Sequence, residues 1–273
     1  MLIDTHAHVN FNAYKDDGEE VIKRALADNI WLVNVGSQYS TSARAVKITE
    51  RYEKGVFAAI GLHPIHLGSE RFQVTVDENE EVEFETREES FKKEKYASLI
   101  LNQKTIAVGE IGLDYHHNAG NKERQKDLFS EQIDFAMEHQ KPIIVHCRDA
   151  HNDVLEILEE KRKKWGKELR GVVHSFSGRL TQAEKYVELG FCLGFNGIIT
   201  FARDYDKVIS NISLDKLLTE TDCPYLTPAP FRGKRNEPLY VQYVADKLAE
   251  IKKLPVEKIS EITFENAREL FNI

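Results

Sequence analysis

Short apolar runs alternate along the chain with segments whose apolar residues recur every three or four positions. Continuous apolar runs of this length indicate buried strands, and the 3.6-residue period indicates amphipathic helices. The expected strands begin with residues 2–3 and continue with 30–35, 56–60, 105–110, 142–146, 171–174, 191–195 and 217–222. The expected helices are 19–28, 40–52, 88–102, 122–139, 152–164, 181–189, 204–212, 237–253 and 256–271, and Ser40 or Thr41 would be the N-cap of the second.

Eight strands, each followed by helical sequence, predict an α/β fold of the (β/α)8 type, a single TIM-type barrel over residues 1–273. Consecutive parallel strands need helical crossovers, and one barrel commonly fills this length. A doubly wound open sheet would share the local pattern, but no glycine-rich phosphate fingerprint follows the first strand. Neither a linker nor a repeat suggests a second domain.

The segment at about 69–89, after the third strand, breaks this alternation. Residues 70–89 carry nine acidic residues against two arginines, yet apolar and polar positions alternate on both sides of a turn-like stretch at 77–80. Alternation around a polar turn favours a β-hairpin, whereas the charge alone would favour a disordered loop. We expect an acidic hairpin insertion beside the active-site face, where loops after barrel strands lie. A hairpin that leans outward is the alternative.

Composition and charge exclude several classes of protein. The formal net charge of -8 argues against a general nucleic-acid coat protein, and no stretch approaches the length of a membrane span. Cys147, Cys192 and Cys223 are odd in number and form no CxxC pair, so a disulfide framework is not expected. Cys147 and Cys223 each follow a candidate ligand, so strand alternation should turn them toward the helices. The start of the chain lacks a signal-peptide pattern, which makes the cytoplasm the default location.

Histidines and carboxylates fall at the ends of five expected strands. His6 and His8 are two positions apart at the end of the first strand, so they project to the same side. The ends of strands 4, 5, 6 and 8 carry Glu110, His146, His174 and Asp222, respectively. In a barrel these ends ring one mouth. Six ligands are too many for one tetrahedral ion and suit two divalent ions, bridged by a carboxylate such as Glu110. Singly, each could be a buried ion-pair partner or a core histidine, but clustering them without a metal would be costly.

The motifs around these residues resemble those of the TatD family of metal-dependent deoxyribonucleases, within the amidohydrolase-like metal-dependent hydrolases. They run almost end to end, at residues 4–8, 61–64, 109–115, 146–150, 174–178, 220–226 and 230–238. The resemblance implies a TIM-type barrel with one metal ion on His6, His8, Glu110 and Asp222, and a second on Glu110, His146 and His174. The acidic hairpin is the departure, since it looks longer than the family's usual connection.

The expected reaction is hydrolysis of a phosphodiester by water that two metal ions activate, with Glu110 and Asp222 as catalytic ligands and Asp222 as proton acceptor. Candidates for binding the substrate phosphate are His63, Arg148, Arg232 and Lys234. A surface ion pair is the alternative for these cations, with nearly equal weight for Lys234 and Arg235. The resemblance suggests a DNA end as substrate with Mg²⁺ or Mn²⁺, and the histidine-rich set would also accept Zn²⁺.

Two other functions compete with this interpretation. The same metal pair could hydrolyse an amide, a lactone or an aminoacyl-tRNA ester, and a bridging lysine on the fourth strand would favour amide chemistry. Glu110 occupies that place. A non-catalytic metal-binding barrel would be favoured by losses among the six ligands, and none is lost.

Overall fold

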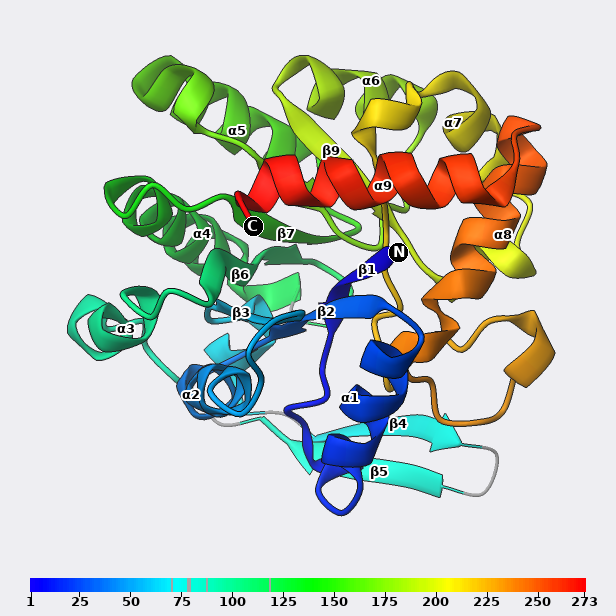
Figure 1. The fold of residues 1–273 in the computed structure, drawn as a ribbon. Helices are drawn as coiled ribbons and strands as arrows, with labels where there is room; N and C mark the ends of the chain where they lie inside the picture. Colours follow the sequence, from blue (N-terminus) through cyan, green and yellow to red (C-terminus); the bar gives the residue numbers. More distant parts are fainter. Residues whose placement is uncertain (70, 78–79, 87, 118) are drawn as a thin grey trace.

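Eight parallel strands form one sheet that curls into a barrel, with helices around its outside (Figure 1). The computed structural model describes residues 1–273 except 70, 78, 79, 87 and 118, and for 71–77, 80–85 and 119 it describes the backbone. The barrel strands, in sheet order, are β1 (Leu2–Ala7), β2 (Ile30–Val35), β3 (Val56–Ile60), β6 (Thr105–Asp114), β7 (Ile143–Arg148), β8 (Gly171–Val173), β9 (Phe191–Phe195) and β10 (Leu217–Thr219). The expected (β/α)8 barrel is confirmed.

Helices follow the strands as the alternating pattern requires. They are α1 (Gly18–Ala27), α2 (Tyr39–Thr49), α3 (Lys93–Ile100), α4 (Lys122–Glu138), α5 (His151–Trp165), α6 (Leu180–Glu188), α7 (Asp206–Asn211), α8 (Val241–Lys252) and α9 (Val256–Phe271). Among the described residues, none of these helices has the length and apolar character needed to cross a membrane.

The barrel closes between β10 and β1 through side chains as well as backbone. Thr5 Oγ1 donates to the Thr219 carbonyl, and Thr219 Oγ1 donates to the Ile3 carbonyl, both at 3.1 Å. Toward the mouth, the Asp222 N–H donates to the His6 carbonyl at 2.8 Å, and the His8 N–H to the Cys223 carbonyl at 2.9 Å. The seam therefore brings together two segments with candidate ligands, residues 6–8 and residue 222, which lie more than 200 residues apart in the chain.

Two separate apolar layers build the core. One fills the barrel and takes side chains from every strand, namely Ile3, Val33, Ala59, Ala107, Ile144, Val172, Cys192 and Leu218. Helix α9 closes the end of the barrel near the chain termini with Phe264 and Phe271 (Figure 1). The other layer lies between strands and helices, and there the Cys147 thiol contacts His151 of α5 and Tyr186 of α6. The expected outward direction of Cys147 is thus observed.

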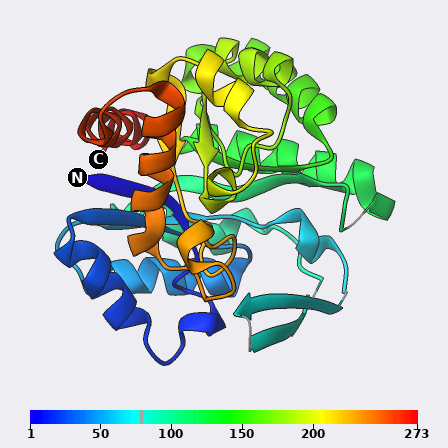
Figure 2. The same ribbon diagram turned by 90° about the vertical axis from the view of Figure 1, so that its right-hand side faces the viewer.

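The segment after β3 forms a separate two-stranded antiparallel sheet of β4 (Arg71–Asp77) and β5 (Glu80–Glu85). Residues 78 and 79 of the expected turn lie outside the described residues, and the length of this segment relative to the family stays a prediction. In Figure 2 the sheet stands on the side of the molecule opposite the chain termini. The carboxyl ends of the barrel strands point toward this same side. Its base is held by the Glu89 N–H donating to the His66 carbonyl at 2.9 Å and by Thr86 Oγ1 donating to the Gly68 carbonyl at 2.9 Å.

Several expected boundaries were wrong, each for a local reason. Helix α3 begins at Lys93 rather than 88, because the backbone of Glu88 and Glu89 bonds to the base of the hairpin instead. Helix α2 begins at Tyr39 with Gln38 as N-cap, and Thr41 Oγ1 accepts the Gln38 N–H from inside the first turn at 3.0 Å. Strand β6 continues past Glu110 to Asp114, so Glu110 lies within a strand rather than at its end.

Candidate metal centre

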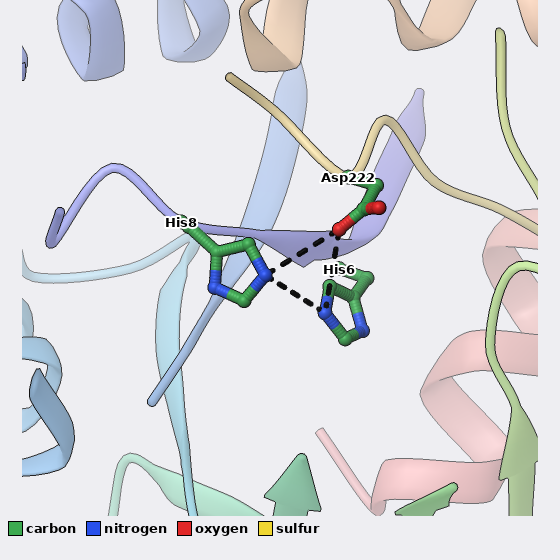
Figure 3. Close-up of side chains that lie close together, drawn as sticks. All are labelled: His6, His8 and Asp222. Carbon is green, nitrogen blue, oxygen red and sulfur yellow. Dashed lines mark hydrogen bonds and ion pairs between the residues drawn. The ribbon is translucent and has the colours of Figure 1, made fainter. Parts of the chain in front are cut away.

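The seam of the barrel presents His6, His8 and Asp222 to the same point (Figure 3). His6 Nε2 lies 3.1 Å from His8 Nε2 and 3.7 Å from Asp222 Oδ1, and His8 Nε2 lies 3.4 Å from Asp222 Oδ1. Both histidines are buried, whereas the Asp222 side chain keeps 15% exposure. His6 lies in β1, whereas His8 follows it and Asp222 follows β10. As expected, the two histidines still face the same side.

Glu110 completes this first set with its Oε2 atom. It lies 3.5 Å from His6 Nε2 and 3.9 Å from His8 Nε2. A tetrahedral shell with bonds of about 2.1 Å has edges of about 3.4 Å. Five of the six separations among these four atoms, those that involve His6 or His8, are 3.1 to 3.9 Å and bracket that edge. The donor set therefore fits a divalent ion in both chemistry and spacing.

The other oxygen of Glu110 faces a different pair of histidines. Glu110 Oε1 lies 2.8 Å from His146 Nδ1 and 2.7 Å from His174 Nε2, and these two nitrogens are 3.4 Å apart. The two Glu110 contacts are short enough to be direct hydrogen bonds. Glu110 thus offers one oxygen to each of two ligand sets, which is the geometry of a bridging carboxylate.

His8 and His146 each have a hydrogen-bond partner behind the ring that fixes its orientation, and His174 has only a nearby carboxylate. His8 Nδ1 bonds the Val35 carbonyl at 2.8 Å, and His146 Nε2 bonds Asp114 Oδ2 at 3.1 Å. His174 Nδ1 lies 3.5 Å from Glu220 Oε1, a long contact. Such partners select the tautomer and direct the free nitrogen toward the metal. His6 Nδ1 has no hydrogen-bond partner in the described part of the chain, and its ring stacks on His174 with centroids 3.9 Å apart.

Asp114 connects the centre to the surface. Besides His146, its carboxylate accepts from His117 Nδ1 at 2.9 Å and from the backbone N–H groups of His116 and His117 at 3.0 and 2.8 Å. Our sequence analysis gave Asp114 no role. Its position four residues after Glu110 on the same long strand was the available signal, because alternation places both on one face.

Glu220 is the second supporting carboxylate that sequence analysis missed. It is fully buried, and Oε1 accepts the Ser175 N–H at 2.6 Å. Space for it exists because residue 194 on β9 is glycine, since a Cβ there would overlap Glu220 Oε2. In the strand expected at 217–222, Glu220 alternates with Asp222, and this was the available signal.

Asp4 links the two sides of the seam between β1 and β10. Its Oδ1 accepts the Thr221 N–H at 2.9 Å and the His6 N–H at 3.2 Å, and its Oδ2 accepts Thr221 Oγ1–H at 2.5 Å. Next to Thr221, Asp222 has a φ of 57°, in the left-handed region that non-glycine residues rarely adopt. A residue in that conformation persists only when its surroundings enforce it. The strained turn ends β10 at Thr219 and places the Asp222 carboxylate at the mouth.

Neighbouring histidines keep the Glu110 carboxylate ionised. Burial alone would raise the pKa of Glu110, but His174, His63 and His6 outweigh it and hold that pKa well below its usual range. Burial would lower the pKa of His174 and His146, but the carboxylates around them raise both. For His6 burial prevails and, with the nearby His174, lowers its pKa. Burial would also raise the pKa of Asp222, but hydrogen bonding with His8 and nearby histidines lower it.

Comparisons with known proteins identify the family of this chain. The model of the family described as TatD related DNase matches residues 3–272. The chain belongs to the TatD family. It is 43% identical over 276 residues to the uncharacterized metal-dependent hydrolase YabD of Bacillus subtilis strain 168, and the match covers 100% of both chains. The TatD homologue YjjV from Escherichia coli K12 superposes with a TM-score of 0.85 at 31% identity, covering 100% of this chain and 98% of YjjV.

A more distant structure, the hydrolase TatD family protein from Entamoeba histolytica, shares the fold with a TM-score of 0.80 at 21% identity. It covers 99% of this chain and 97% of its own. The protein is therefore a metal-dependent hydrolase of the TatD family.

His63 of this TatD family member lies beside the two ligand sets. Together with Asp114 and His146 it forms a third group with metal-ligand spacing. However, His63 Nδ1 accepts the Ile65 N–H at 3.1 Å, so the proton of the neutral ring is on Nε2. Nε2 lies 3.6 Å from Glu110 Oε1. Burial, with His146 nearby, lowers the pKa of His63 well below its usual range and keeps the ring neutral.

The remaining predicted substrate residues lie at the rim of the TatD barrel. Arg148 ends β7, on the same strand face as His146, and Arg232 and Lys234 follow β10. All three are exposed, and none has a carboxylate within ion-pair distance among the described residues. Arg235 differs, because it pairs with Asp17 and donates to the Ala13 carbonyl. The surface ion pair considered for Arg235 is thus observed.

Proposed function

We propose that this TatD family member hydrolyses phosphodiester bonds of DNA, with two divalent ions bridged by Glu110. The observation that carries the proposal is the division of Glu110, whose Oε2 faces His6 and His8 while Oε1 faces His146 and His174. The bound ions would lower the pKa of water and neutralise charge on the phosphate oxygens. The physiological metal we expect is Mg²⁺ or Mn²⁺, with Zn²⁺ accepted as well.

Asp222 would accept the proton from the attacking water. Its lowered pKa keeps it ionised. Its side chain is also more exposed than those of His6, His8 and Glu110, the other members of the first ligand set. Only its Oδ1 atom faces the two histidines. The other oxygen can therefore take a proton while the ligand contacts persist.

His63 and the rim cations would bind the phosphate. The His63 Nε2–H is directed toward Glu110 and is within reach of an oxygen bound beside it. Arg148, Arg232 and Lys234 carry positive charge that no described carboxylate neutralises. Guanidinium groups match phosphate geometry with two parallel hydrogen bonds. Such donors favour a phosphodiester over an uncharged amide or lactone.

The deciding experiment is nuclease assay on defined single-stranded and duplex oligonucleotides after chelation and metal add-back. We expect hydrolysis that returns with Mg²⁺ or Mn²⁺ and is lost in Glu110→Gln and Asp222→Asn. Glu94→Gln, the same chemical change at an exposed position on α3, is the matched control and should keep full activity.

Metal analysis under saturating metal tests the centre separately. Two ions per wild-type chain are expected, and at most one would refute the bridged pair. Hydrolysis of an aminoacyl-tRNA ester, a lactone or an amide, with no hydrolysis of any DNA, would instead establish the competing hydrolase function. Circular dichroism of both acid variants must match wild type, because these strand positions carry chemistry rather than folding stability.

A further inference from the structure

Two rim segments pack together after β9 and β10. The Ala229 N–H at the start of η7 (Ala229–Phe231) donates to Thr200 Oγ1 at the end of η5 (Gly197–Thr200) at 2.8 Å. Gly197 allows the approach, since a Cβ there would overlap the Leu226 carbonyl oxygen. Both segments follow barrel strands, so they lie on the mouth side. Their contact fixes the positions of the residues that come next, Phe201 and Arg232.

Phe201 is exposed at this rim. Its exposed fraction is 43%, and among the large apolar residues described only Met1 and Leu101 are also exposed. Met1 is the first residue of the chain, and Leu101 follows α3. The guanidinium of Arg232 lies over the Phe201 ring, 4.1 Å from its centroid. A planar cation held over an exposed aromatic ring offers flat surfaces on which a further flat group can stack.

The positive charge at Phe201 and Arg232 favours a flat ligand group that carries negative charge nearby. Arg232 and Lys234 are exposed and have no carboxylate partner among the described residues. A ligand that presents both a π-face and a negative charge matches the pair, and a nucleotide unit presents both. Aromatic side chains interleaved with basic residues are how proteins hold unpaired nucleic acid.

We propose that Phe201 and Arg232 form a stacking platform for an unpaired base at the barrel mouth, the side on which the metal centre lies. The inference rests on the proposed nuclease function and assigns these two residues to a base of the substrate strand. Bases in a duplex are already stacked and paired, so using the platform there requires unpairing at an energetic cost. The platform therefore favours single strands over blunt duplex.

The test compares Phe201→Ala and Phe201→Trp with Leu101→Ala, an exposed apolar residue away from the rim, as control. For Phe201→Ala we expect KM on a single-stranded oligonucleotide to rise about 5- to 150-fold, the range for loss of one stacked base. The kcat should change little, and KM on blunt duplex should stay near wild type. Phe201→Trp should keep wild-type KM, and Leu101→Ala should change neither substrate.

Stacking is read directly with 2-aminopurine placed next to the terminal phosphate, in the Glu110→Gln background to prevent cleavage. Its fluorescence should be quenched on binding, and Phe201→Ala should remove most of that quenching. Equal KM and equal quenching in Phe201→Ala and wild type would overturn the platform while DNA hydrolysis still supports the nuclease. Loss of activity on single-stranded and duplex DNA alike in Phe201→Ala would also overturn it, since selectivity would be absent. Failure of wild type to cleave any DNA would instead refute the proposed function.

Discussion

Asp114 and Glu220 stand behind the two histidines of the second ligand set, and they differ in how firmly they hold them. Asp114 bonds His146 Nε2 at 3.1 Å, whereas Glu220 lies 3.5 Å from His174 Nδ1. With Nε2 bonded to Asp114, His146 offers Nδ1 to the centre, while His174 offers Nε2. Orientation of this kind contributes to metal affinity without direct contact to the ion.

Replacing Asp114 with Asn should weaken the second ion by about 10- to 100-fold, the usual effect of losing an outer carboxylate partner. The amide keeps the size of the side chain but removes its charge. Calorimetric titration of the chelated protein with Mn²⁺ should show one site weakened and the other unchanged. Asp127→Asn, at an exposed position on α4, is the control. Two unchanged sites in Asp114→Asn would show that His146 needs no such support.

The two ligand sets should also differ in their response to pH. In the metal-free centre the carboxylates raise the pKa of His146 and His174, while burial, with His174 nearby, lowers the pKa of His6. A histidine must be neutral to bind a metal, so protons compete at higher pH for the second set than for the first. On stepwise acidification from pH 8, metal analysis should show the second ion leaving first. Simultaneous loss of both ions would contradict this order.

At the scale of elements, two neighbouring strands share the space inside the barrel near the mouth. Glu220 follows β10 and occupies the place beside β9 where residue 194 has no side chain. A buried carboxylate needs this room because it cannot move into solvent. The absence of a side chain on one strand therefore positions a functional group on the next.

Gly194→Ala should destabilise the fold by about 1–3 kcal/mol, the usual cost of overpacking a filled interior. It should also displace Glu220 and weaken binding of the second ion. Chemical denaturation and metal titration check the two effects. Gly120→Ala is the control, since a Cβ there meets nothing within 4 Å. A Gly194→Ala variant as stable as the control would show that Glu220 has room to move.

At the scale of the whole molecule, charge is distributed unevenly around the mouth. Exposed cations lie at the end of β7 and after β10, whereas the segment after β3 carries nine acidic residues within 70–89. Figure 2 places its two-stranded sheet on the mouth side. A polyanion approaching from that direction meets repulsion, which is strongest at low salt, where the Debye length is ~30 Å at 0.01 M.

Replacing residues 70–87 with a short Gly/Ser linker should therefore increase cleavage of long duplex DNA relative to single strands. The gain should be larger at low salt than at high salt. Kinetics on both substrates at two ionic strengths measure it. If preference and salt dependence both stay unchanged, the hairpin leans outward and does not restrict entry.

The sequence by itself determined the strand–helix alternation and the identity of the candidate ligands. Strand boundaries at 30–35, 56–60 and 191–195 match β2, β3 and β9, because fully buried parallel strands are continuous apolar runs. His6 and His8 could be paired in advance, since strand alternation is local and independent of the rest of the chain.

Only the tertiary structure decided which groups stand behind the ligands. The contacts of Asp4 with Thr221, Gly194 with Glu220 and Phe201 with Arg232 each join different strands or loops, and no local period encodes them. The tautomer of His63 depends on one backbone N–H at the start of η2 (Pro64–Leu67). Periodicity reports which face of an element is buried, whereas the partner across that face is fixed only when the barrel closes.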